Sequence, residues 1–210
     1  EKAGNIPLVQ VSTCYVNGYH KGVMKERLVD PSGSDIVQDE QGYYDIEALV
    51  ARCRAKAEKI RQQNVDKDKL YDSLVELGID IANEYGWNDT YTFTKWMGEQ
   101  LLHKRLAGKS LTILRPAIVE SALEEPMEGW IEGVKVADAL ILAYARRRFD
   151  FFPARLKGIV DIIPVDFVVN GIILAAAEAI DAGDSHKVYQ CCSSGQNPLS
   201  IKEYIEIVTD

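Results

Sequence analysis

Two short segments carry the side chains best suited to chemistry in this chain of 210 residues. Ser12 and Thr13 end an apolar run and supply hydroxyl groups. Tyr91 and Lys95 lie four residues apart, which places a phenol and an ammonium group on one face of a helix. A hydroxyl, a phenol and a nearby cation can together protonate a carbonyl oxygen while a hydride arrives at its carbon. The combination predicts a nicotinamide-dependent reductase.

Each of these groups has a distinct role in such a reaction. The Tyr91 phenol is a proton donor at neutral pH, and the charge of Lys95 favours the phenolate that proton transfer leaves behind. A hydroxyl of Ser12 or Thr13 can hydrogen-bond the substrate oxygen on which negative charge develops. Adjacent residues of a strand point to opposite faces, so only one of the two hydroxyls can do this. The Tyr-x-x-x-Lys spacing alone is weak evidence, and the preceding strand gives it its weight.

The elements that must position these residues alternate between strand-like and helix-like segments. Asn88 or Asp89 is expected to cap the helix that carries Tyr91, and the polar stretch 17–42 reads as a long loop. The patterns predict strands at 7–13 (buried), 111–114, 159–163 and 187–191, and helices at 45–63, 67–85, 89–106, 131–148, 165–180 and 200–208.

This alternation predicts an α/β fold, the later half of a doubly wound, Rossmann-type parallel sheet with added helices and a small substrate-binding portion. Ligands of such sheets bind beyond the carboxyl ends of the strands, where Thr13 falls. We expect residues 1–210 to form the catalytic and substrate-binding part of one domain, with 43–86 as a helical insertion within it. No Gly-rich turn between a strand and a helix occurs in these residues. The Gly-rich cofactor-binding part is therefore expected upstream of Glu1, and the chain alone is expected to be inactive.

The composition limits the possible binding partners and the expected cellular compartment. The net charge of -8 argues against nucleic acid or an anionic membrane as the main partner. The four cysteines lack C-x-x-C spacing and the three histidines are scattered, so no metal site is predicted and a reduced, cytoplasmic location is expected. No stretch approaches the ~20 apolar residues of a transmembrane helix. Any membrane association is expected to involve regions outside this chain.

Five motifs in order give the chain a family resemblance. They are Val-Ser-Thr-Cys-Tyr-Val-Asn-Gly (11–18), Tyr-Thr-Phe-Thr-Lys (91–95), Leu-Arg-Pro-Ala-Ile-Val (114–119), Glu-Pro-Met-Glu-Gly-Trp-Ile (125–131) and Ile-Pro-Val-Asp (163–166). Together they resemble the fatty acyl-CoA reductases, members of the extended short-chain dehydrogenase/reductase superfamily. Each motif is weak evidence alone, but the five occur in the family's order and are spread over nearly the whole chain.

The resemblance implies NADPH as hydride donor and a long-chain acyl-CoA as the small-molecule substrate, reduced to an aldehyde and on to a fatty alcohol. It implies that Tyr91 is the general acid and that Lys95 holds the nicotinamide ribose and tunes Tyr91. It selects Thr13 over Ser12 as the catalytic hydroxyl. Pro116, Ala117 and Ile118 would line the nicotinamide pocket.

Two alternatives stand beside this interpretation. A thioester reductase domain that releases a carrier-bound acyl chain shares the hydroxyl, Tyr and Lys, although the 125–131 motif favours the enzymes that use free coenzyme A. A non-catalytic Rossmann-like interaction module would account for the missing Gly-rich turn. The sequence makes no prediction of oligomeric state.

Overall fold

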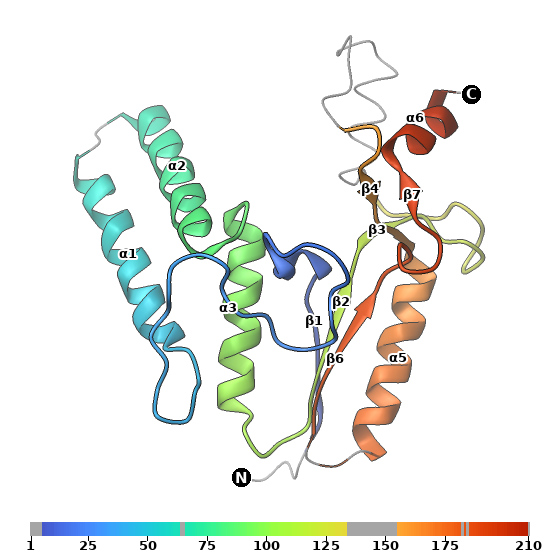
Figure 1. The fold of residues 1–210 in the computed structure, drawn as a ribbon, viewed down its shortest axis with the longest axis horizontal. Coiled ribbons are helices and arrows are strands. Elements are labelled where there is room, and N and C mark those ends of the chain that lie inside the picture. Colours follow the sequence, from blue (N-terminus) through green and yellow to red (C-terminus); the bar gives the residue numbers. More distant parts are fainter. Residues whose placement is uncertain (1–5, 64–65, 134–154, 182, 184, 210) are drawn as a thin grey trace.

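A three-stranded parallel sheet organises the fold. The computed structural model describes residues 6–63, 66–133, 155–181, 183 and 185–209. Strands β1 (Leu8–Val11), β2 (Leu111–Pro116) and β6 (His186–Cys191) pair in the order β1-β2-β6. Helices α3 (Thr90–Arg105) and α5 (Val165–Asp181) lie on opposite sides of this sheet (Figure 1). The predicted α/β class with a parallel sheet is confirmed.

Burial differs sharply between the strands. All six residues of β2 are buried, as expected for the central strand of a covered parallel sheet. In β1, Leu8 and Val11 are each 38% exposed, so the prediction of a buried strand is wrong there. The physical reason is position, since β1 is an edge strand that pairs only with β2 within the part of the chain that the structure describes.

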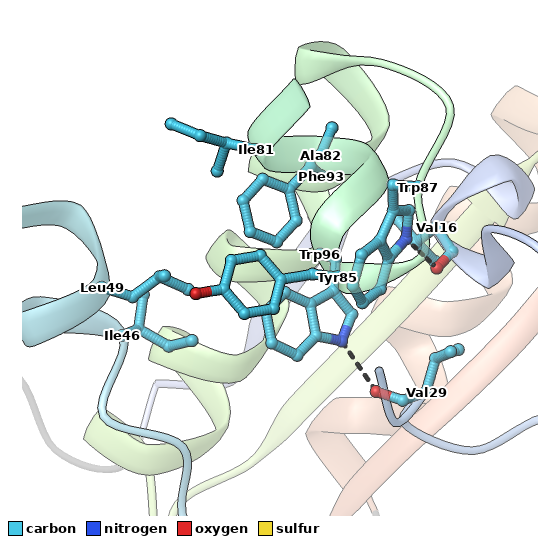
Figure 2. Close-up of a cluster of buried hydrophobic side chains, with 10 residues drawn as sticks. All are labelled: Val16, Val29, Ile46, Leu49, Ile81, Ala82, Tyr85, Trp87, Phe93 and Trp96. Atoms are coloured by element: carbon cyan, nitrogen blue, oxygen red, sulfur yellow. Dashed lines mark hydrogen bonds between the residues drawn. The ribbon is translucent and has the colours of Figure 1, made fainter. Parts of the chain in front are cut away.

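A helical hairpin packs beside α3. Helices α1 (Ile46–Gln63) and α2 (Lys67–Tyr85) run next to each other, and α2 ends at Gly86, which adopts a left-handed conformation with φ 104°. The rings of Tyr85, Phe93, Trp87 and Trp96 form an aromatic core between the hairpin and α3 (Figure 2). The Tyr85–Phe93 centroids lie 5.4 Å apart and those of Trp87 and Trp96 lie 4.7 Å apart. Contacts between buried aromatic rings stabilise packing, so this core holds α3 against the hairpin.

The long loop before α1 is anchored by its carbonyl groups. The Val29 carbonyl accepts hydrogen bonds from Trp96 Nε1 at 2.7 Å (Figure 2) and from Gln100 Nε2 at 3.3 Å. Arg115 Nη1 donates to the Arg27 carbonyl at 3.0 Å. These bonds fix the middle of the loop against α3 and β2.

A buried ion pair joins α3 to β2. Arg115 Nε lies 2.9 Å from Glu99 Oε1 and Arg115 Nη2 lies 2.5 Å from Glu99 Oε2. The two side chains are 0% and 1% exposed. Glu99 is one helical turn after Lys95, so this two-bond pair sets the position of the helix segment that carries Lys95.

Short strands build a second region beyond the sheet. Strand β3 (Ile118–Glu120) pairs in parallel with β5 (Ile162–Pro164), and β4 (Ile159–Val160) pairs antiparallel with β7 (Leu199–Ser200). The single strand predicted over 159–163 is therefore wrong. Asp161 separates β4 from β5, and its carboxylate accepts a hydrogen bond from Ser193 N at 2.9 Å.

The remaining elements agree with the sequence patterns to within a few residues. Helix α6 (Ile201–Thr209) follows Ser200, whose Oγ accepts from Glu203 N at 3.2 Å while Ser200 N donates to the Glu203 carboxylate at 2.9 Å. This is the reciprocal capping box expected at a helix start. The helix predicted over 131–148 falls mostly outside the described residues.

Candidate active site

Thr13 begins a tight turn directly after β1. It has extended backbone angles (φ -154°, ψ 148°) and caps the 3-10 helix η1 (Cys14–Asn17), with its Oγ1 accepting from Tyr15 N at 3.3 Å. The Thr13 side chain is buried. Since Oγ1 already accepts one hydrogen bond, the proton of the Thr13 hydroxyl is available for donation to another acceptor.

A close contact between two backbone segments fixes the turn against the residues that precede α3. Gly18 has φ 57°, and a Cβ atom there would lie 2.3 Å from the Gly86 carbonyl oxygen. Glycine is therefore required at position 18. Trp87 Nε1 donates to the Val16 carbonyl at 2.7 Å (Figure 2), which ties η1 to the residues just before α3.

Helix α3 begins at a strong cap and presents Tyr91 in its first turn. Asp89 is the N-cap, accepting from Thr92 N at 2.8 Å, which resolves the choice between Asn88 and Asp89. Tyr91 is 57% exposed. Lys95 Nζ lies 5.8 Å from the centroid of the Tyr91 ring and 3.5 Å from the Val11 carbonyl oxygen at the end of β1. The structure thus brings Tyr91 and Lys95 to the carboxyl end of β1, beside Ser12 and Thr13.

The two candidate hydroxyls differ in their partners. Ser12 N donates to the Leu114 carbonyl at 2.7 Å, and Ser12 Oγ is buried with no hydrogen-bond partner among the described residues. Thr13 Oγ1 accepts from Tyr15 N. Both hydroxyls lie in the region of the site, so the choice of Thr13 stays a prediction.

The expected pocket residues follow the neighbouring strand. Pro116 ends β2 opposite Cys191, Ala117 N donates to the Cys191 carbonyl at 3.0 Å, and Ile118 begins β3. The register of β1 and β2 ends with the pair Val11 and Leu114, and both the turn at Thr13 and Pro116 follow that pair. Pro116, Ala117 and Ile118 therefore lie at the same edge of the sheet as the turn at Thr13, and their role toward the nicotinamide stays a prediction.

Asp166 is a structural residue that sequence reasoning missed. Its carboxylate accepts hydrogen bonds from Leu123 N (3.1 Å), Glu124 N (3.0 Å) and Glu125 N (3.3 Å). Burial acts to raise the pKa of Asp166, but the hydrogen bonds from these backbone N–H groups outweigh burial, so the pKa lies below its ordinary value. The carboxylate holds the segment after β3 in place. One sequence signal could have pointed to this contact, because the segments 125–131 and 163–166 are both motifs that carry the family resemblance.

The described residues show neither a metal-binding cluster nor a membrane-spanning helix. Within the described residues, no group of three or more His, Cys, Asp or Glu side chains is arranged to hold a metal ion. None of the helices described has the length and apolarity to cross a membrane.

Comparison with known proteins gives these features a family context. An NAD-binding family described as male sterility protein matches residues 1–172. The probable fatty acyl-CoA reductase 5 of Arabidopsis thaliana is 36% identical over 95% of this chain and 40% of its own length. The alcohol-forming fatty acyl-CoA reductase of Simmondsia chinensis is 32% identical over 95% of this chain and 40% of its own length. The chain thus spans about two fifths of the length of these relatives.

A solved structure supports the fold alone. The terminal R domain of the myxalamid PKS-NRPS biosynthetic pathway superposes with a TM-score of 0.51 at 14% identity, over 97% of this chain and 37% of that one. The family match covers four fifths of the chain and contains the Thr13 turn, the Tyr91/Lys95 helix and the Asp166 contact. The chain belongs to the male sterility protein family, that of the fatty acyl-CoA reductases.

Proposed function

We propose that the full-length protein containing this chain reduces long-chain fatty acyl-CoA to the aldehyde and on to the fatty alcohol, with NADPH as hydride donor. The observation that carries the proposal is the placement of Tyr91 and Lys95 at the carboxyl end of β1, where Lys95 Nζ donates to the Val11 carbonyl. The names of the relatives, one of them alcohol-forming, support the substrate and product classes.

The residues present fit the nicotinamide end of such a cofactor. The Tyr91 phenol is accessible, and the Lys95 ammonium lies one turn away at the carboxyl end of β1. Lys95 and Tyr91 would hold the nicotinamide ribose, with Pro116, Ala117 and Ile118 lining the pocket. The dinucleotide supplies the hydride when bound.

In this proposal the chain supplies the proton and the site for the carbonyl oxygen. Tyr91 donates its phenolic proton to the substrate oxygen as general acid. The positive charge of Lys95 stabilises the phenolate that remains. Thr13 donates a hydrogen bond to the same oxygen with the proton that its contact to Tyr15 N leaves available.

The test is a phenol deletion in the full-length protein. We expect Tyr91→Phe to lower kcat for acyl-CoA reduction by about 10²–10⁴, the usual contribution of a positioned general acid. The affinity for NADPH should stay within a few-fold. Tyr71→Phe is the matched control, because Tyr71 is 69% exposed on α2 and remote from the site. Full activity in Tyr91→Phe would contradict the proposal.

Substrate, cofactor and domain assignments have their own tests. We expect faster reduction of long-chain acyl-CoA than of the same acyl chain on a carrier protein, and faster turnover with NADPH than with NADH. The reverse order for the acyl substrates would favour a carrier-releasing reductase. We further propose that residues 1–210 form the catalytic and substrate-binding part of the reductase domain, with 43–86 inserted in it, and that the protein is cytoplasmic.

A further inference from the structure

A small cavity lies in the loop that follows the turn at Thr13, among residues that have no part in the proposed proton transfer. Asn17, the last residue of η1, borders it, and the rest of its lining comes from the loop between His20 and Asp30. Its volume is about 190 Å³, below the ~300–1,000 Å³ of sites that enclose a whole drug-sized ligand. The cavity therefore suits one small group of a larger ligand that is bound beside the turn.

Hydrogen bonds hold the loop that lines this cavity. His20 Nε2 lies 3.0 Å from the Asp30 carbonyl oxygen, and because a carbonyl oxygen only accepts, the His20 ring donates this bond. The bond joins the two ends of the loop. The neighbouring Val29 carbonyl accepts from Trp96 and Gln100 of α3. The cavity thus lies in a closed loop that is fixed to the helix of Tyr91 and Lys95.

Three cationic residues border the cavity, namely Lys21, Lys25 and Arg27. Their side chains are exposed, and within the part of the chain that the structure describes, none of the three takes part in an ion pair. The chain as a whole carries a net charge of -8. Three cations without carboxylate partners around one cavity are therefore a local departure from an acidic protein.

The acidic residues of the same loop leave this charge largely uncompensated. The Glu26 carboxylate lies outside the lining and accepts a hydrogen bond from Gln190 N of β6 at 2.9 Å. Asp30 belongs to the lining, and its Oδ1 accepts from the Tyr44 hydroxyl at 2.8 Å. The described lining thus carries three positive charges against one negative charge, a balance that attracts an anion.

We propose that this cavity binds a phosphate group of the coenzyme A part of the acyl-CoA substrate, an inference that rests on the proposed function. Lysine and arginine form charge-assisted hydrogen bonds with phosphate oxygens, and Lys21, Lys25 and Arg27 supply such donors here. The pantetheine arm separates the phosphates of coenzyme A from the thioester. A phosphate site beside the turn at Thr13, and not at the Thr13 hydroxyl itself, fits that separation.

The dinucleotide is the other source of phosphate in the proposed reaction. In dinucleotide-binding folds, the pyrophosphate lies at the Gly-rich turn and the ribose phosphate close to it. We expect that turn upstream of Glu1, so the phosphates of the dinucleotide have a site of their own. The observations therefore favour coenzyme A, and the test includes both sources.

The first test is steady-state kinetics of the full-length protein with palmitoyl-CoA and with palmitoyl-pantetheine, which lacks the phosphates and the adenosine. We expect Lys21→Gln with Lys25→Gln to raise KM for palmitoyl-CoA about 3- to 30-fold, because each exposed charge pair contributes modestly. The preference for palmitoyl-CoA over palmitoyl-pantetheine should shrink by the same factor. Lys21→Arg with Lys25→Arg keeps both charges and should keep the preference.

A control variant and the second substrate make this result specific. Lys67→Gln with Lys69→Gln removes two exposed lysines from the first turn of α2, at the opposite end of that helix from Gly86, and should leave KM for palmitoyl-CoA unchanged. KM for NADPH should stay within about twofold in Lys21→Gln with Lys25→Gln. A raised KM for NADPH with an unchanged KM for palmitoyl-CoA would assign the cavity to the dinucleotide and overturn the proposal.

Direct binding separates this proposal from the proposed function. Calorimetric titration of coenzyme A into the full-length protein should give a Kd about 3- to 30-fold higher in Lys21→Gln with Lys25→Gln than in the unsubstituted protein. An equal Kd in the two proteins, or no binding of coenzyme A to either, would overturn the phosphate site. A failure of the proposed function would instead appear as full activity in Tyr91→Phe, which does not depend on this titration.

Discussion

Breaking the buried Arg115–Glu99 pair should cost far more stability than breaking a surface pair of the same chemistry. In Glu99→Gln one carboxylate oxygen is replaced by an amide nitrogen, and the Arg115 guanidinium remains buried without a counter-charge. Removing one partner of a buried ion pair typically costs about 3–5 kcal/mol. With a typical urea dependence, that lowers the midpoint of unfolding by about 1–3 M.

A surface pair in the same chain provides the control. Arg105 Nη2 lies 2.7 Å from Glu47 Oε1, but these side chains are 62% and 67% exposed. Glu47→Gln should therefore change the free energy of unfolding by less than about 1 kcal/mol. Urea unfolding of the full-length protein, followed by the fluorescence of buried Trp87 and Trp96, measures both variants.

A double substitution separates the uncompensated charge from the loss of contacts. Arg115→Met with Glu99→Leu removes both charges and leaves the Arg27 carbonyl without the donor that Arg115 supplies, at a cost of about 1–3 kcal/mol. The double variant should therefore be more stable than Glu99→Gln. Equal losses in Glu99→Gln and Glu47→Gln, or a double variant less stable than Glu99→Gln, would refute this reasoning.

Two further perturbations address the turn at Thr13 and the segment after β3. Gly18→Ala should destabilise the protein by more than about 2 kcal/mol, because it adds a Cβ in the left-handed region against the Gly86 carbonyl. Gly98→Ala, in open space on α3, should instead be neutral or stabilising; thermal unfolding compares the two. In Asp166→Asn we expect the amides of residues 123–125 to exchange with solvent at least about tenfold faster at neutral pH. Because the pKa of Asp166 is lowered in the folded protein, its contribution is fully present above the ordinary value of 3.8 and is lost as the pH falls through the lower folded value. The stability difference between the unsubstituted protein and Asp166→Asn should therefore shrink in acid, and a pH-independent difference would contradict the assignment.

Local signals in the sequence determined where several helices begin and end, and that Tyr91 and Lys95 share one face of a helix. The bounds of α2 and α5, the Asp89 cap and the Ser200 capping box follow from short-range periodicity and hydrogen bonding, which neighbouring residues specify. The placement of Tyr91 and Lys95 on one face follows from helix geometry alone.

Only the tertiary structure decided how these pieces meet. Within the described residues, the strand order β1-β2-β6 leaves Leu8 and Val11 exposed, although their sequence reads as a buried strand. Lys95 reaches the Val11 carbonyl across 84 residues, and Asp166 binds backbone groups more than 40 residues earlier. Such contacts depend on strand register and packing between distant segments, which no local pattern of residues specifies.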